Sequence, residues 1–443
     1  MTNGLLRQSR FTTFDGTLSL VTDHQRPDRY SHLESLEYDR PRIARGGGYA
    51  YSASSFGADS LVQEMTCFNR FLKFDPETLV LTVEAGVRLI DIMTWAIPRH
   101  MHLPVLPGYP LVTVGGCVAA DVHGKNPFKD GTFADWVKGL TLYHPQKGYQ
   151  VCSAVKLPEL FAMTCGGFGM TGIITEVTLQ LAKLPAPALA VTGASLHSLQ
   201  EASRTLLSCE ADIAYSWHDA CPGPGFGKGI MYTGHWAQQE KGAADSLSFT
   251  PMTAKSRATL PFSVWNGITA RMANKALLLQ NDIAGASRAT DILKASFPFA
   301  TNPYFHKLFG KRGLRETQFL VSEANIERCL DGLKQLINAT GAPTMMISLK
   351  RFRGAQQSLS MTGTGILVAL DCFRNARTES FMEALDAQIL EFDAQPNLSK
   401  DSRLPGSIAK QTLPGLVKFE QTLHRYDKDR LMRSELSDRL GLQ

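Results

Sequence analysis

The chain has 443 residues, 44% of them hydrophobic, so it can bury one large core or two ordinary ones, and two domains are the default expectation. The net charge of +5 is small for this length, and without a basic run it gives no argument for a nucleic-acid partner. The eight cysteines form no C-x-x-C pair, which argues against a disulfide framework or a zinc site and favours reduced thiols in the cytoplasm. No apolar stretch approaches the length of a bilayer span, and the N-terminus lacks the apolar core of a signal peptide.

The first feature along the chain is a glycine run at residues 45–52, which follows a short strand-like stretch. Three consecutive glycines, Gly46, Gly47 and Gly48, let a main chain approach a flat or anionic ligand and offer several N–H groups to a pyrophosphate. A plain turn without a ligand is the competing interpretation.

A strand and a helix are expected next. Residues 79–85 alternate as a strand does and end at Gly86, and residues 89–97 follow the period of a helix up to Pro98.

A second glycine pair, Gly115 and Gly116, is followed closely by His123, Lys125 and Asn126. Glycines permit close approach of the main chain, and a histidine and a lysine beside them supply a proton carrier and a cation. This combination predicts a cofactor-binding segment. For His123 alone, a structural histidine bonded to a backbone carbonyl remains an equal alternative.

A third glycine segment, residues 166–172, leads into the alternating strand pattern of residues 173–181. Its order is loop and then strand, whereas a nicotinamide dinucleotide fingerprint needs strand, glycine loop and then helix. We therefore reject a Rossmann-type site here.

A proline and alanine cluster at residues 185–188 is the best candidate for a domain boundary. Beyond it, strand-like runs such as residues 345–349 alternate with helical patterns such as residues 381–390. A last amphipathic helix over residues 431–440 is expected to pack back on the first domain. The pattern as a whole predicts an α+β architecture.

The three glycine segments, taken in chain order, resemble the flavin-binding half of the vanillyl-alcohol oxidase and p-cresol methylhydroxylase superfamily. Within it, residues 83–87, 103–108 and 112–126, with His-Gly-Lys-Asn at 123–126, look like the decaprenylphosphoryl-β-D-ribose 2′-oxidase family. Further likeness lies at residues 215–217, 318–319, 349–352 and 400–403.

This resemblance implies two domains. A p-cresol methylhydroxylase-type FAD-binding domain would comprise residues 1–185 and be completed by residues 395–443. An α/β substrate-binding domain with a largely antiparallel sheet would comprise residues 186–394. The active site would lie at their interface, with Lys350 and Lys400 facing the flavin ring from the substrate side.

The resemblance also implies which residues bind FAD. The first glycine loop holds no histidine, the usual covalent attachment point in the superfamily, so we expect non-covalent FAD with Tyr51 near the ring or the substrate. The expected cofactor-binding residues are Arg45, Gly46, Gly47, Gly48, Tyr49, Ala50, Tyr51, Pro107, Gly108, Thr113, Val114, Gly115, Gly116, Ala119, Ala120, His123, Gly124, Asn126, Gly169, Gly172, Ile173 and Ile174.

The expected chemistry is removal of a hydride from a carbinol carbon by the flavin, which then carries negative charge near N1. A fixed cation or donor aimed at that charge stabilises the transition state, and the candidates are His123, Lys125 and Lys400. Either a neutral imidazole or a lysine of lowered pKa would accept the hydroxyl proton. Tyr51 completes the set of catalytic candidates.

Carried over from the family, Gln318 would hydrogen-bond the substrate sugar and Trp217 would line its pocket, together with Lys350 and Lys400. Each has an ordinary structural alternative. Lys350 would be a solvated strand end, Lys400 a charged residue near a helix N-cap, and Gln318 and Trp217 core or sheet residues.

The expected function is oxidation of a secondary hydroxyl of a glycosyl substrate to a keto sugar, most plausibly on a polyprenyl-phosphate-linked pentose. In the family a short-chain NAD(P)H-dependent reductase then completes an epimerisation, and a polyprenyl substrate would bring a cytoplasmic enzyme to the inner face of the membrane. The alternatives are an aldonolactone or polyol oxidase that uses oxygen, and a flavoprotein without turnover. The first glycine loop and the Pro127-Phe128 pair depart from the family pattern, so a reshaped pocket is expected.

Overall fold

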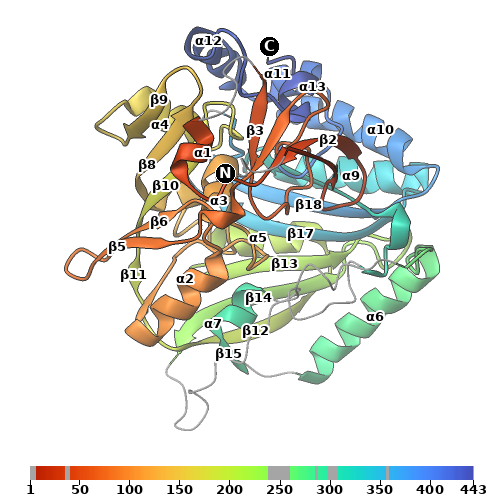
Figure 1. Cartoon of the computed structure of the whole chain (residues 1–443). Helices are drawn as coiled ribbons and strands as arrows, with labels where there is room; N and C mark the ends of the chain where they lie inside the picture. The colour runs from red at the N-terminus through yellow and green to blue at the C-terminus, as the bar shows by residue number, and fades with distance from the viewer. Residues whose placement is uncertain are drawn as a thin grey trace.

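The computed structural model describes residues 6–34, 40–237, 260–284, 288–297, 307–355 and 359–442. The strands of residues 19–45 and the helices of residues 406–439 lie together in the upper part of Figure 1, and the strands of one large sheet run below them. The chain is therefore a mixed α and β protein, as the sequence patterns predict.

Two smaller sheets carry the N-terminal part of the chain. One has the strand order β1-β2-β4-β3, and the other, β5-β6-β10-β8-β9, is antiparallel throughout. The strands expected at residues 79–85 and 173–181 are confirmed as β6 and β10. The strands span β1 Arg7–Thr12, β2 Ser19–Gln25, β3 Arg42–Arg45, β4 Leu61–Glu64, β5 Phe71–Asp75, β6 Val80–Glu84, β8 Val137–His144, β9 Gly148–Cys152 and β10 Ile173–Gln180, and a separate pair joins β7 Met101–His102 to β11 Ala182–Lys183.

The helices of this part are short. The helix expected at residues 89–97 is confirmed as α2, Leu89–Ala96, whose apolar face packs into the core beside β6 and β10. The others are α1 Tyr30–Glu34, α3 Val114–Ala120 and α4 Pro158–Thr164.

Helix α3 contains the second glycine pair, Gly115 and Gly116. Its N-cap is Thr113, whose hydroxyl accepts a hydrogen bond from the Gly116 N–H at 3.4 Å. The Gly115 N–H donates to the Ala85 carbonyl at 2.8 Å, and a Cβ added to Gly115 would lie 2.8 Å from the Cβ of Ala85. Glycine is needed here because the first turn of the helix touches the end of β6.

One large antiparallel sheet of eight strands carries the second part of the chain, in the order β15-β12-β14-β13-β17-β18-β16-β19. The strand expected at residues 345–349 is confirmed as part of β17. The strands span β12 Ala188–Leu196, β13 Ile213–Asp219, β14 Gly229–Ala237, β15 Arg288–Asp291, β16 Leu314–Val321, β17 Thr344–Phe352, β18 Gly365–Phe373 and β19 Gln395–Pro396.

The two faces of this sheet differ in chemistry. Apolar side chains of β16, β17 and β18, such as Phe319, Leu349 and Val368, pack with three helices in one core. These helices are α5 Leu199–Ser208, α9 Ile326–Thr340 and α10 Thr378–Glu391, the last confirming the helix expected at residues 381–390. Residues that alternate with the apolar ones point to the other face, because successive side chains of a strand point to opposite sides.

The end of the chain returns to the N-terminal sheets. Met432 forms a parallel bridge with Arg42 of β3, and the Glu435 N–H donates to the Phe56 carbonyl at 2.9 Å. Leu436 and Leu440 share a core cluster with Phe168. The helices are α11 Gly406–Thr412, α12 Leu416–Tyr426 and α13 Glu435–Arg439.

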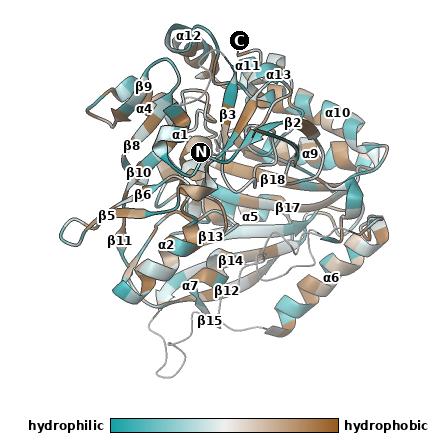
Figure 2. Cartoon of the chain, viewed as in Figure 1, coloured by the Kyte–Doolittle hydropathy of each residue, from teal (hydrophilic) through white to brown (hydrophobic). Residues whose placement is uncertain are grey.

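Helix α6, Gly267–Ala284, lies at the edge of the molecule, and α7 spans Ile292–Ser296 (Figure 1). Four apolar side chains of α6 are exposed and spaced by 4, 7 and 4 residues, so they share one face of the helix: Ile268, Met272, Leu279 and Ile283. Brown, apolar segments alternate with teal ones along α6 in Figure 2. Within the described ranges, no helix combines the length and apolarity that crossing a bilayer needs.

Candidate functional site

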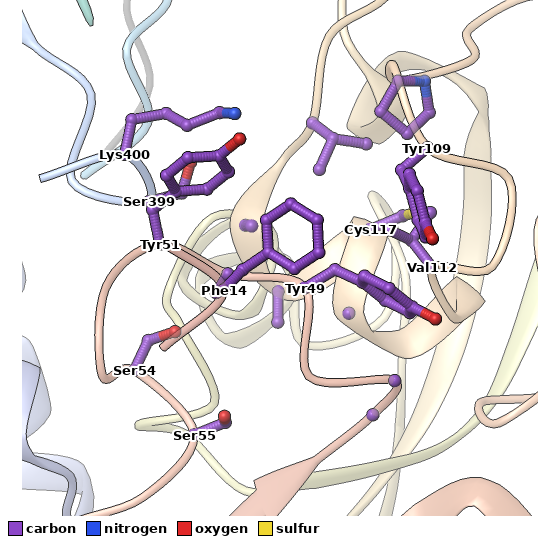
Figure 3. A pocket seen from close by; sticks show the side chains of 18 of the residues that line it. Phe14, Tyr49, Tyr51, Ser54, Ser55, Tyr109, Val112, Cys117, Ser399 and Lys400 are labelled. Atoms are coloured by element: carbon purple, nitrogen blue, oxygen red, sulfur yellow. The ribbon is translucent and has the colours of Figure 1, made fainter. Parts of the chain in front are cut away.

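A cavity of about 370 Å³ lies between the glycine segments and the polar face of the large sheet. Both the N-terminal elements and strands β16, β17 and β18 contribute to its lining, and Figure 3 shows side chains from several of these segments around it. The cavity thus lies between the two parts of the chain at whose interface the active site is expected.

One wall of the cavity consists largely of main chain. After β3 the backbone runs through Gly46, Gly47 and Gly48, where Gly48 has φ +73°, a conformation that favours glycine. A Cβ added to Gly46 would collide with the Thr113 hydroxyl. Gly116 of α3 continues this wall. A surface without side chains suits a flat, extended ligand.

An aromatic group that the sequence did not single out lies in the middle of this wall. The ring of Phe14 packs against Tyr49, Tyr51 and Tyr109, with ring centroids 5.3 to 5.6 Å apart. Figure 3 shows Phe14 between Tyr51 and Tyr49. Phe14 comes from the β1–β2 turn, and its N–H donates to the Ala50 carbonyl at 2.9 Å. Nothing in the local sequence of this turn predicts its contacts with the glycine loop.

The opposite wall is the polar face of the large sheet. Gln318 of β16 lies opposite Ala369 of β18, which in turn lies opposite Ser348 of β17, and all three line the cavity. The next row contains Glu316, Asp371 and Met346, which also line it. The carboxyl groups of this row were missed by sequence reasoning, although Glu316 shares the face of Gln318 two residues away.

Lys400 reaches the cavity from the loop after β19. Its Nζ lies 3.2 Å from Oε1 of Glu316 and 3.9 Å from the centre of the Tyr51 ring. Figure 3 shows the amino group of Lys400 pointing past the Tyr51 hydroxyl. Burial, followed by the negative charges of Glu316 and Asp371, raises the pKa of Tyr51 well above its usual value. Tyr51 is therefore a neutral phenol at physiological pH.

Gln318 connects three groups. Its Nε2 donates to Glu316 at 2.6 Å, and its Oε1 accepts from Asn397 at 3.0 Å and lies 3.4 Å from Nε2 of His123. His123 itself is not among the residues that line the cavity. Burial, followed by the charge of Lys350, lowers the pKa of His123 to about 3, so this histidine is neutral and sits behind Gln318.

Lys350 lines the cavity on the sheet side, and its Nζ donates to the Gly124 carbonyl at 3.4 Å. Burial, with repulsion from Lys400 as the next cause, lowers the pKa of Lys350 to about 8. At pH 7 the side chain still carries its charge.

Lys125 is not brought into the cavity. Its Nζ donates to the carbonyls of Ala295 and Ser296, the latter at 2.7 Å, and lies over the Tyr215 ring. Burial lowers the pKa of Lys125 well below its usual value. Trp217 is also outside the lining, one strand beyond Ser348 in the same row of the sheet.

The other residues expected to bind the cofactor divide clearly. Four do not line the cavity: Val114, Gly124, Asn126 and Ile173. Those that line it are Arg45, Gly46, Gly47, Gly48, Tyr49, Ala50, Tyr51, Pro107, Gly108, Thr113, Gly115, Gly116, Ala119, Ala120, Gly169, Gly172 and Ile174.

Residues 34–152 match the family described as FAD binding domain. The chain is also similar to a decaprenylphosphoryl-beta-D-ribose oxidase of Mycolicibacterium smegmatis, with 28% identity over 92% of this chain and 90% of that protein. Residues 34–152 thus match an FAD binding domain, and the chain is similar to an oxidase along nearly its whole length.

Some other relatives match a smaller part of the chain. An L-gulonolactone oxidase of Bos taurus is 33% identical over 30% of this chain and 30% of its own length. A D-lactate dehydrogenase of Anaerostipes hadrus is 32% identical over 32% of this chain and 30% of its own length. Each of these two matches covers only about a third of this chain, so the substrates in those names carry little information about this cavity.

The residues present fit FAD. The matched range includes the two glycine segments at Gly46 and Gly115, where a Cβ would meet neighbouring atoms, and at these glycines the main chain itself lines the cavity. The third segment adds Gly169 and Gly172, both with positive φ, on the same cavity.

Proposed function

We propose that this protein oxidises a secondary hydroxyl of a glycosyl substrate, a polyprenyl-phosphate-linked pentose, to the keto sugar. The observation that carries this proposal is one cavity with a cofactor wall of glycines and a substrate wall of polar side chains, which includes Lys350 and Lys400. The similarity to a decaprenylphosphoryl-beta-D-ribose oxidase along nearly the whole chain supports the same substrate class.

In this proposal the glycine segments would hold FAD, which would supply the hydride-accepting chemistry when bound. The chain itself binds and orients the sugar on the sheet wall. Gln318 is held by Glu316 and Asn397, so its orientation is set before the substrate arrives. Lys350 and Lys400 supply positive charge for a phosphate-linked substrate and for charge that develops on the reduced cofactor.

The other candidate residues take supporting roles. His123 is neutral and braces Gln318. Lys125 fixes the carbonyls at the end of α7 and so ties the FAD binding domain to the part that carries the large sheet. Trp217 of β13 pairs with Ser348 of β17 and supports the sheet beside this lining residue.

We propose non-covalent attachment of FAD. The first glycine loop holds no histidine, and burial raises the pKa of the Cys117 thiol, which lines the cavity (Figure 3). A protonated thiol is a poor nucleophile for attachment to a flavin. Acid precipitation should leave a colourless pellet and all of the FAD in the supernatant, and a yellow pellet would contradict this.

We also propose that the chain divides into an FAD-binding domain of residues 1–185 and 395–443 and a substrate-binding domain of residues 186–394. Support comes from the contacts of Arg42 with Leu431 and Arg433 and from the strand composition of the large sheet. Excision of residues 186–394 with a short linker tests whether the remainder still binds FAD.

Two partners follow from the proposed substrate. A short-chain NAD(P)H-dependent reductase would return the ketone with inverted configuration. A bilayer would present the polyprenyl carrier, and the exposed apolar face of α6, with the exposed Arg271 and Lys275 beside it, suits an anionic membrane surface. We expect a cytoplasmic protein that contacts the inner face of the membrane.

The deciding experiment is anaerobic titration of the oxidised protein with polyprenyl-phosphate pentoses, free aldonolactones and polyols, followed by flavin absorbance. Bleaching by a phosphate-linked pentose supports the proposal. Bleaching by a free aldonolactone or polyol, with rapid peroxide formation in air, supports the oxidase alternative. An FAD-loaded protein that no sugar bleaches would point to a flavoprotein without turnover.

A further inference from the structure

Asp371 is a charged residue of the cavity lining to which the proposed function assigns no role. It lies near the end of β18, opposite Glu316 of β16 and Met346 of β17, and its side chain lines the cavity with only 8% of the residue exposed. Throughout the ranges that the structure describes, no hydrogen bond or ion pair reaches its carboxyl oxygens. A carboxyl group buried in this way without a partner is costly unless a ligand or a proton satisfies it.

The carboxylate of the neighbouring Glu316, in contrast, has partners. Glu316 has Lys400 at 3.2 Å and accepts the Nε2–H of Gln318 at 2.6 Å. Its negative charge is therefore compensated, and it stands beside Asp371 as a fixed charge. Burial, then the charge of Glu316, raises the pKa of Asp371 well above its usual value, while Lys400 opposes the rise. A carboxylate of raised pKa is a stronger base than an ordinary aspartate.

We propose that Asp371 is the catalytic base, which binds the reacting hydroxyl of the substrate and accepts its proton. The inference rests on the proposed function. The C–H bond of the carbinol breaks and both of its electrons pass to FAD as a hydride. The O–H bond breaks, its electron pair forms the C=O bond, and the proton goes to a carboxylate oxygen of Asp371. The substrate loses two electrons and FAD gains two.

The other candidates for this role are placed less favourably. His123 lies behind Gln318 and outside the lining. Lys400 is held in an ion pair with Glu316, and Lys350 donates to a backbone carbonyl. Tyr51 is a neutral phenol under the Lys400 ammonium, which makes it a donor to the substrate. Among the charged side chains that line the cavity in the described ranges, only Asp371 offers acceptor oxygens that no other group occupies.

The groups that face Asp371 come from each element around it. They are Glu316 on β16, Lys400 on the loop after β19, and Tyr51 on the first glycine loop. Lys350 lines the same wall from β17. Glu316 and Lys400 oppose each other in charge, so the ionisation of Asp371 decides the net charge at this end of the cavity.

The test compares Asp371→Asn and Asp371→Glu with Asp121→Asn as a matched control. Asp121 is also a buried aspartate of raised pKa, but it lies outside the cavity lining. The reductive half-reaction is followed in FAD-loaded protein by anaerobic stopped flow with the sugar that bleaches the wild type. We expect Asp371→Asn to lose at least about 100-fold in the reduction rate with little change in substrate Kd. The Glu variant should recover part of this loss, and the control should retain the wild-type rate.

The pH profile gives a second kinetic readout. The wild-type reduction rate should rise with pH through a midpoint above the ordinary aspartate range, and this step should vanish in Asp371→Asn. A reduction rate of Asp371→Asn within about threefold of wild type overturns the proposal. So does a large rise in Kd at an unchanged rate, which would assign Asp371 to the recognition of a cationic or hydroxyl group instead.

A third readout needs no substrate. Infrared difference spectra of the FAD-loaded protein between pH 5 and 9 should contain a protonated carboxyl band that disappears at the same midpoint and is absent from Asp371→Asn. A wild type without such a band at pH 5, or the same band in Asp371→Asn, would contradict the inference. Failure of the proposed function alone would appear differently, as an intact band in a protein that no glycosyl substrate reduces.

Discussion

Lys350 offers a quantitative test of the sheet wall. Its pKa is lowered from 10.5 to about 8, mainly by burial, so the folded protein binds fewer protons than the unfolded chain between these two values. Each pKa unit corresponds to about 1.4 kcal/mol, so keeping Lys350 charged costs the folded state about 3 kcal/mol at pH 7. This cost disappears as the pH rises from 8 to 10.5.

Substitution of Lys350 by methionine removes the charge and keeps an unbranched side chain of similar length. We expect Lys350→Met to unfold with a free energy about 3 kcal/mol higher than wild type at pH 7, and this advantage should shrink steadily toward pH 10.5. Urea unfolding of the FAD-loaded proteins at a series of pH values, followed by tryptophan fluorescence, measures the difference. Lys350→Arg is the control, because it keeps a charge at every pH tested and should gain no stability at pH 7. A wild-type minus variant difference that stays constant with pH would refute the argument that burial governs this lysine.

Burial raises the pKa of Asp121 from 3.8 to about 6, so the folded state loses stability as the pH rises through this interval. We expect Asp121→Asn to be about 3 kcal/mol more stable than wild type at pH 7 but not at pH 4. A stability difference between variant and wild type that is equal at both pH values in urea unfolding would count against this. Gly46→Ala should lose FAD on gel filtration because the new Cβ meets Thr113. The control Gly354→Ala, whose new Cβ meets nothing within 4 Å, should retain FAD. Equal FAD content in the two variants would rule out the glycine segments as the FAD-binding site. Glutamate at both Ile268 and Ile283 should reduce cosedimentation with vesicles that contain anionic lipid, and unchanged binding would exclude α6 as the membrane contact.

Much of the local structure could be predicted from the sequence because it depends on short periods. The alternation at residues 173–181 and the helical spacing at residues 89–97 each report on a single element, and both elements are present as β10 and α2. The glycine run predicted a close approach of the main chain, and the structure contains it. A Cβ at Gly46 would collide with Thr113, and Gly48 has a positive φ.

The candidate site was less predictable because its side chains come from distant segments. His123 and Lys125 stand beside the glycine pair in the sequence, yet one sits behind Gln318 and the other is diverted to the carbonyls of Ala295 and Ser296. Spacing along a chain cannot show which partner a long side chain will find. Asp371 carried only a slight signal, a charged residue after the apolar run of residues 365–370.

The sequence by itself determined that this chain has a glycine-lined cofactor segment and an α+β architecture, because close approach and strand or helix periodicity are local properties. Only the tertiary structure decided which groups meet across the cavity. The register of β16 against β18 places Glu316 opposite Asp371, and the loop after β19 brings Lys400 to the same point. Burial at that meeting point then changes the pKa of Asp371, a long-range effect that exists only once the sheet and the glycine wall enclose it.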